Sequence, residues 1–239
     1  MGTCNEELRR ITLVSGLGAG YHEPMAAVWQ WREDRAEELW QAAREHLNAA
    51  QLLALPTETF YALAAHPYQE KALVHLFSLK RRSPDKPVLL LVSGPDMVPR
   101  LARDISALAR KLMARFWPGP LTLILPARPE LSWWLTGGTE GVGLRQPRQE
   151  VTCRLIAALG FPVTGTSANR TGQAALTRAD EVERTFGEDL ALILDAGPCP
   201  GGLPSTVVDV SRDTPRLVRA GAVALADILE IIPNLVVDR

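Results

Sequence analysis

Short runs of apolar residues recur along the chain, and they constrain its fold more than any other feature of the sequence. The clearest are "QLLAL" (51–55), "VLLLV" (88–92), "LTLIL" (121–125) and "LALIL" (190–194). Each has the length of an ordinary strand and lacks alternating polar residues, which predicts strands that are buried on both faces. Because such strands need cover on both sides, the runs favour a sheet layered by helices.

Segments with a helical repeat separate these runs. In residues 34–50 the apolar side chains fall on one helical face, formed by Ala36, Leu39, Trp40, Ala43 and Leu47. Thr177 is expected to cap a helix over 181–186, and residues 127–141 are expected to form an irregular loop. We expect further helices over 69–79, 106–116, 150–159 and 225–232, and further strands at 142–145, 206–210 and 216–219.

Strands and helices interleave without strict βαβ order, so we expect an α/β fold with a mixed sheet layered by helices. A single domain is expected at residues 25–239, preceded by a poorly defined extension at residues 1–24. The extension contains "RRITLVSGLGAG" (9–20), whose weak apolar part does not have the pattern of an export signal. No run of 18 apolar residues exists, so no membrane partner is expected.

Charge and cysteine usage narrow the classes of function. The net charge of -1 excludes a polycation that binds nucleic acid through its overall charge, although the 26 Lys and Arg residues can still gather in a local groove. Cys4, Cys153 and Cys199 have no C-x-x-C spacing, and the four histidines have no metal-like spacing. We therefore expect reduced thiols, no protein metal site and a cytoplasmic location.

Two polar clusters follow predicted elements and each allows two interpretations. In "LPTETFYAL" (55–63), the residues after the proline form either a capping turn for a following helix or a ligand site. In "LKRRSPDKP" (79–87), the four cations either favour a helix C-terminus or bind a polyphosphate.

A third cluster, "VTGTSANRTG" (163–172), is either an ordinary turn or a ligand cradle. In an extended backbone Ser167 and Asn169 point the same way, and Gly165 allows the backbone to approach a ligand closely. Arg145, Ser205 and Arg219 are further candidates, although each alone would be an ordinary surface residue.

Seven motifs together are far more specific than any one of them. In order they are "PTETFYAL", "KRRSPDKP", "FWPGPLTLIL", "VGLRQP", "GTSANRTG", "PSTVVDV" and "LVRAGAV". In this order and spacing the chain resembles the YrdC/TsaC family over residues 53–223, which favours the ligand cradle at 163–172. The resemblance implies a twisted α/β sheet with a concave basic groove, in the short form of the family without an additional C-terminal domain.

The resemblance also implies an activity, that of an L-threonylcarbamoyl-AMP synthase. Such an enzyme combines L-threonine, bicarbonate or CO2, and ATP with its Mg2+, and releases pyrophosphate. Downstream threonylcarbamoyl-transfer proteins then use the product to modify tRNA. An RNA partner, either tRNA or double-stranded RNA, is a further expectation. The reaction needs positive charge and alignment more than acid–base groups, which agrees with the lack of a Ser–His–Asp pattern.

The family's site residues can be carried over motif by motif. Lys80 and Arg82 match its K-x-R element and are the expected catalytic residues, with the threonine carboxylate expected on Arg145. The expected ATP-binding residues are Lys80, Arg82, Ser167, Asn169 and Arg219. The expected L-threonine-binding residues are Thr57, Arg145, Gly165 and Ser205.

The chain departs from the family pattern at four places: "YALA" (61–64) replaces "YGLG", Lys86 replaces the Asn of "NP", "GTSAN" replaces "APSAN", and Ala175 replaces a serine. Two alternatives stay open. One is a YrdC-like protein that binds double-stranded RNA or tRNA without forming an adenylate. The other is a carbamoyl-transfer module that uses carbamoyl phosphate, although such modules usually belong to longer chains.

Overall fold

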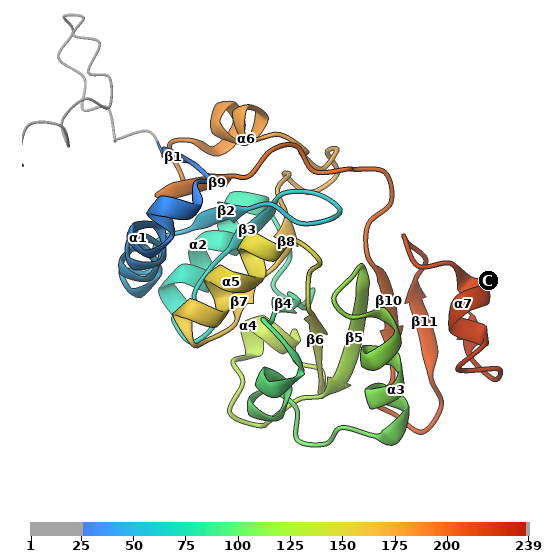
Figure 1. The fold of residues 1–239 in the computed structure, drawn as a ribbon. Coiled ribbons are helices and arrows are strands. Elements are labelled where there is room, and N and C mark those ends of the chain that lie inside the picture. Colours follow the sequence, from blue (N-terminus) through green and yellow to red (C-terminus); the bar gives the residue numbers. More distant parts are fainter. Residues whose placement is uncertain (1–25, 238–239) are drawn as a thin grey trace, which may run out of the picture.

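The computed structural model describes residues 26–237, in which the strands form two mixed sheets (Figure 1). The extension expected at residues 1–24 lies outside the described residues. The first sheet has the order β1 (Ala27–Gln30), β9 (Leu192–Asp195), β2 (Leu53–Leu55), β3 (Ala62–Ala64) and β8 (Thr166–Ser167). The second has the order β12 (Val236–Val237), β11 (Arg216–Arg219), β10 (Thr206–Asp209), β5 (Leu121–Pro126), β6 (Gly141–Arg145), β4 (Leu90–Leu91) and β7 (Val163–Thr164).

The expected α/β class is confirmed, and the division into two sheets is a finding that the apolar runs did not indicate. Both sheets contain parallel and antiparallel pairs, since β2 runs parallel to β9 and antiparallel to β3, while β5 runs parallel to β10 and antiparallel to β6. All three residues of β2 are buried, as expected of a strand covered on both faces.

Gly165 alone separates β7 of the second sheet from β8 of the first sheet. It follows β7, which pairs with β4, and precedes β8, which pairs with β3. Its N–H donates to the carbonyl oxygen of Leu89 at 2.9 Å. A Cβ at this position would lie 2.5 Å from Cγ of Leu91, so the side chains on and beside β4 leave no room for a side chain here.

The helices cover the two sheets (Figure 1). The face predicted for residues 34–50 is confirmed, because α1 (Ala36–Asn48) buries the same five side chains and packs on β2 and α5 (Glu150–Leu159). Helix α3 (Ala107–Phe116) packs on β5, and Ser106 accepts the N–H of Ala109 at 3.1 Å as its cap. The other helices are η2 (Glu33–Arg35), α2 (Glu70–Lys80), η3 (Pro95–Arg100), α4 (Trp133–Thr136), α6 (Ala179–Phe186) and α7 (Leu225–Leu229).

Two local predictions are corrected. Helix α6 begins at Ala179 with Arg178 as its N-cap, so the Thr177 cap is wrong; instead the Glu181 carboxylate accepts the N–H groups of Thr177 and Arg178, both at 3.1 Å. The loop expected at 127–141 contains α4, whose Leu135 is fully buried. Within residues 26–237 no helix has the length and apolar character needed to cross a membrane.

Candidate active site

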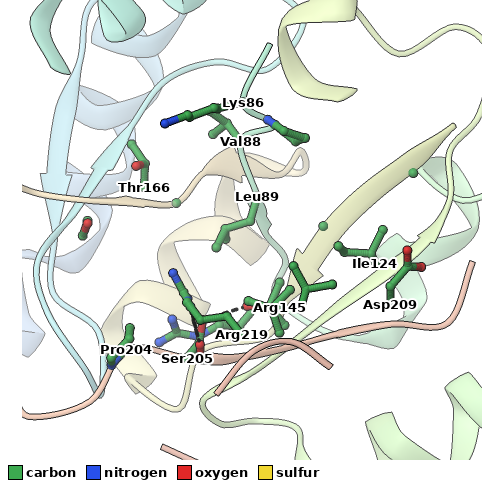
Figure 2. A pocket seen from close by; sticks show the side chains of 18 of the residues that line it. Lys86, Val88, Leu89, Ile124, Arg145, Thr166, Pro204, Ser205, Asp209 and Arg219 are labelled. Carbon is green, nitrogen blue, oxygen red and sulfur yellow. Dashed lines mark hydrogen bonds between the residues drawn. The ribbon is translucent and has the colours of Figure 1, made fainter. Parts of the chain in front are cut away.

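A cavity of about 940 Å³ lies where the two sheets meet, and both sheets contribute to its lining (Figure 2). The first sheet and its loops supply Thr57 and Ser167, and the second supplies Arg145 from β6 and Arg219 from β11. Six cationic residues line the cavity but only two acidic ones, Glu140 and Asp209, so it forms the expected basic groove. The cationic residues are Arg82, Lys86, Arg103, Arg145, Arg212 and Arg219.

The cavity brings together most of the residues expected to bind substrates. Lys80 and Asn169 are not part of the lining; they lie behind it. Figure 2 shows Ser205, Arg219 and Arg145 grouped at one end of the cavity. The expected residues that do line it are Thr57, Arg82, Arg145, Gly165, Ser167, Ser205 and Arg219.

Thr57 organises the turn that follows β2. Its hydroxyl donates to the carbonyl oxygen of Phe60 at 2.7 Å and accepts the N–H groups of Thr59 and Phe60 at 3.1 and 3.3 Å. The next element is the strand β3, so the interpretation of this turn as a helix cap is wrong. The turn presents the hydroxyls of Thr57 and Thr59, 3.0 Å apart, to the cavity.

Arg145 ends β6 and is almost fully buried, with 5% of its side chain exposed. Its Nη2 lies 2.7 Å from Oε1 of Glu58 and donates to the hydroxyl of Thr59 at 3.2 Å. Glu58 was not among the predicted site residues. Its signal in the sequence is a carboxylate between two threonines, directly after a predicted buried strand and a proline.

Ser205 and Arg219 form a second polar group at the same end of the cavity. The guanidinium of Arg219 donates to the carbonyl oxygen of Ser205 at 3.1 and 2.8 Å and to its hydroxyl at 3.0 Å. The Ser205 hydroxyl also lies 2.9 Å from that of Thr122 on β5. Close backbone contact holds this group, since a Cβ on Gly221 would lie 2.3 Å from the carbonyl oxygen of Pro204.

Lys80 and Arg82 leave the end of α2 in different directions. The Lys80 ammonium donates to the carbonyl oxygen and Oδ1 of Asn169 at 2.8 and 3.1 Å, and to the carbonyl oxygen of Ser167. The Ser167 hydroxyl donates to Oδ1 of Asn169 at 2.7 Å, so these two side chains meet as expected. Arg82 donates to the carbonyl oxygens of Lys86 and Pro87 at 3.1 and 2.6 Å.

The positive charges of Lys80, Arg82, Arg219 and Arg145 repel one another in this order, each acting on its neighbour. Burial, and then the nearby Arg82, lower the pKa of Lys80 to about 8. Burial lowers the pKa of Arg82 and Arg219 as well, with further lowering by Arg219 on Arg82 and by Arg145 on Arg219. Of the four, only Arg145 forms an ion pair among the described residues; the others donate hydrogen bonds to neutral oxygens, although the Asp85 carboxylate opposes the lowering of the Arg82 pKa. The cavity therefore holds unneutralised positive charge, which suits a polyanion.

Other kinds of site find less support within residues 26–237. Burial raises the pKa of both Cys153 and Cys199 to about 11, so these thiols stay protonated near neutral pH and are poor nucleophiles. No group of three His, Cys, Asp or Glu side chains that could hold a metal ion occurs among the described residues.

Comparison with known proteins agrees with this geometry. The family model Sua5_yciO_yrdC, described as "Telomere recombination", matches residues 45–221, which is more than half of the chain. The chain belongs to this family. A relative from Pyrococcus abyssi, named threonylcarbamoyl-AMP synthase, is 35% identical over 88% of this chain and 62% of its own length. One of the same name from Idiomarina loihiensis is 34% identical over 71% of this chain and 92% of its own length.

A solved structure of the same family shows the same fold. The crystal structure of P. abyssi Sua5 complexed with L-threonine has a TM-score of 0.84 and 32% identity, covering 89% of this chain and 63% of that one. The chain thus spans less than two thirds of the length of the P. abyssi family member.

Proposed function

We propose that this protein is an L-threonylcarbamoyl-AMP synthase, which forms threonylcarbamoyl-AMP and pyrophosphate from L-threonine, bicarbonate or CO2, and ATP. The observation that carries the proposal is the line of cations from Lys80 to Arg145, three of which donate hydrogen bonds to neutral oxygens and form no ion pair among the described residues, beside a cavity of about 940 Å³. The names of its relatives and the threonine complex of one of them support the same activity.

The two substrates divide the cavity between them in this proposal. Arg145 takes the carboxylate of threonine, and the hydroxyls of Thr57 and Ser205 and the backbone at Gly165 surround the rest of the amino acid. ATP lies against Arg82, Ser167 and Arg219, where the two cations form no ion pair among the described residues. Lys80 and Asn169 shape the ATP side from behind, because the Lys80 ammonium fixes the backbone that carries Ser167.

The proposed reaction joins two anions and releases a third. The threonine amine forms a bond to the carbon of CO2 and loses a proton, which gives a carbamate; from bicarbonate the same step also releases water. A carbamate oxygen then bonds to the α-phosphorus of ATP while the bond to the bridging β-phosphate oxygen breaks, and pyrophosphate leaves. The residues of the cavity contribute charge and alignment to this displacement.

Mg2+ belongs to the proposal as a companion of ATP. Mg2+ in such sites is held by one or two carboxylates together with phosphate oxygens and water. Among the described residues, the carboxylates of the cavity lining are Glu140, which lies 3.8 Å from Arg103, and Asp209, which accepts two hydrogen bonds from Ser211; these two residues would be the protein ligands of such an ion. The ion would neutralise phosphate charge during the displacement.

The RNA-binding alternative has less support. Its cations would have to reach phosphates on a large duplex, whereas Arg145 and Lys80 are only 4% and 3% exposed. We place the reaction in the cytoplasm, with the product passing to threonylcarbamoyl-transfer proteins that act on tRNA.

Pyrophosphate release tests the proposal directly. The rate is measured with ATP and Mg2+ in the presence and absence of L-threonine and bicarbonate, and the product is identified by mass. Release should require both co-substrates, because the attacking carbamate needs both. ATP binding without threonine-dependent release would contradict the synthase and favour the RNA-binding alternative.

A further inference from the structure

Within residues 26–237, Glu58 is the only carboxylate that forms an ion pair with one of the four cations of the site. Its Oε1 lies 2.7 Å from Nη2 of Arg145, and the two side chains are 13% and 5% exposed. Glu58 does not line the cavity, whereas Arg145 and Thr59 do. The carboxylate therefore stands behind the arginine, on the side away from a bound ligand.

The pair is matched in charge but is not fully hydrogen-bonded. Nη2 of Arg145 donates one N–H to the Thr59 hydroxyl, and its 2.7 Å approach to Oε1 of Glu58 is an ion pair without hydrogen-bond geometry. Oε1 of Glu58 and Nε of Arg145 are both buried and have no hydrogen-bond partner among the described residues. The guanidinium therefore depends on the charge of Glu58 and on the Thr59 hydroxyl for its orientation.

The carboxylate is itself held by the neighbouring chain. Its Oε2 accepts the backbone N–H of Arg148 at 3.0 Å, directly before α5. Within α5 the Thr152 hydroxyl donates to the carbonyl oxygen of Pro56 at 2.7 Å, which fastens the Glu58 turn to the same helix. Glu58 is thus a fixed negative charge, placed by the fold at the back of the arginine.

A fixed charge in this position has two opposite effects on an incoming carboxylate. It holds the guanidinium in one orientation, which favours binding, and it cancels the charge of Arg145 and repels the ligand, which weakens binding. We infer that Glu58 is a positioning residue that orients Arg145 for the substrate carboxylate and also limits how tightly this carboxylate is held. The inference rests on the proposed function for the identity of the substrate.

Two variants separate the two effects. Glu58→Gln keeps the length and one acceptor oxygen but removes the charge, so threonine should bind more tightly, by roughly tenfold for a like charge removed at the far side of one guanidinium. Glu58→Ala removes both charge and support, so threonine should bind more weakly than to the Gln variant. Glu33→Gln is the matched control, since Glu33 pairs with Arg154 at 2.7 Å on the surface, and it should leave binding unchanged.

Calorimetric titration of each protein with L-threonine and with L-threoninamide measures these changes. The gain in Glu58→Gln should appear for threonine and vanish for the amide, which has no carboxylate; loss of packing alone would change both ligands equally. Weaker or unchanged threonine binding in Glu58→Gln, or an equal gain for the amide, would overturn the inference. If Glu58→Ala does not fold, as judged by its Tm, the sign of the Gln result decides.

Pyrophosphate release by the wild-type protein is measured beside these titrations. Absence of threonine-dependent release together with tighter binding of threonine to the Gln variant would refute the proposed reaction and leave the role of Glu58 intact. Normal threonine-dependent release, together with unchanged or weaker threonine binding by Glu58→Gln, would refute the role of Glu58 and leave the proposed reaction intact.

Discussion

Lys80 shows how a buried cation can serve the site without lining it. Lys80→Met keeps most of the length of the side chain and removes the ammonium with its three hydrogen bonds to Ser167 and Asn169. Each hydrogen bond to a charged group contributes about 1.5–3 kcal/mol, and the cost of burying the ammonium is subtracted from their sum. We therefore expect the free energy of unfolding of Lys80→Met to be lower than that of the wild type by about 2–4 kcal/mol. The segment that carries Ser167 should also lose its fixed position.

The same side chain should give the reaction a pH dependence. Because burial and Arg82 lower the pKa of Lys80 to about 8, its charge is lost as the pH rises through this value. The ratio kcat/KM for ATP reports on the free enzyme and should fall by about tenfold per pH unit above this point. Stability should change in the opposite direction: an unfolded lysine keeps its proton up to about 10.5, so between the two values the unfolded state binds more protons and the contribution of Lys80 to stability rises.

Pyrophosphate release from about pH 6.5 to 9.5, with ATP varied at saturating threonine and bicarbonate, measures the effect. Lys80→Met should lower kcat/KM for ATP by about 10²-fold at neutral pH, and its kcat/KM should no longer fall as the pH rises above about 8. Lys71 is an exposed lysine on the same helix α2, and Lys71→Met should keep both the wild-type kcat/KM for ATP and its fall at alkaline pH. A wild-type kcat/KM that does not fall at alkaline pH would refute the reasoning, and so would a fall of kcat/KM at alkaline pH that persists in Lys80→Met.

Three further predictions concern other parts of the chain. Arg145→Ala should raise the KM for threonine and leave ATP affinity nearly unchanged, because the carboxylate that it binds keeps its charge through the reaction; steady-state kinetics with each substrate varied would show the opposite pattern if the two subsites were exchanged. Gly165→Ala should lower the free energy of unfolding by about 1–3 kcal/mol, since its Cβ would lie 2.5 Å from Leu91; an unchanged denaturation midpoint would contradict this close contact. A chain that starts at Met25 should keep its Tm and turnover, and loss of either would show that residues 1–24 contribute to the domain.

The sequence predicted the parts of the fold that rest on local patterns. The buried face of α1 follows from helical spacing, and β2, β5 and β9 follow from apolar runs, because burial on both faces selects such residues. The strands β1, β3, β7 and β8 have only two to four residues and carry no such signal. Their existence depends on partners far along the chain, as with Ala27 of β1 and Leu192 of β9.

The site could be predicted as a set of residues but not as a geometry. The motifs identified Thr57, Arg145 and Ser205, and the structure brings all three to one cavity. The pattern of residues could not show that the Lys80 ammonium donates to Ser167 and Asn169, because these partners lie almost 90 residues further along the chain. Nor could it show that Glu58 pairs with Arg145, since these residues come from different sheets and meet only in the folded chain.

Only Gly165 separates β7 from β8, so the number of residues between these strands determines which side chains of β8 face the cavity. Side chains of an extended strand alternate between two faces, so one residue inserted between β7 and β8 would reverse the direction of every side chain that follows in β8. Ser167 would then turn away from the cavity that it lines, although no residue of the candidate site had been replaced. The spacing of one residue between β7 and β8 is therefore as much a part of this cavity as the side chains that line it.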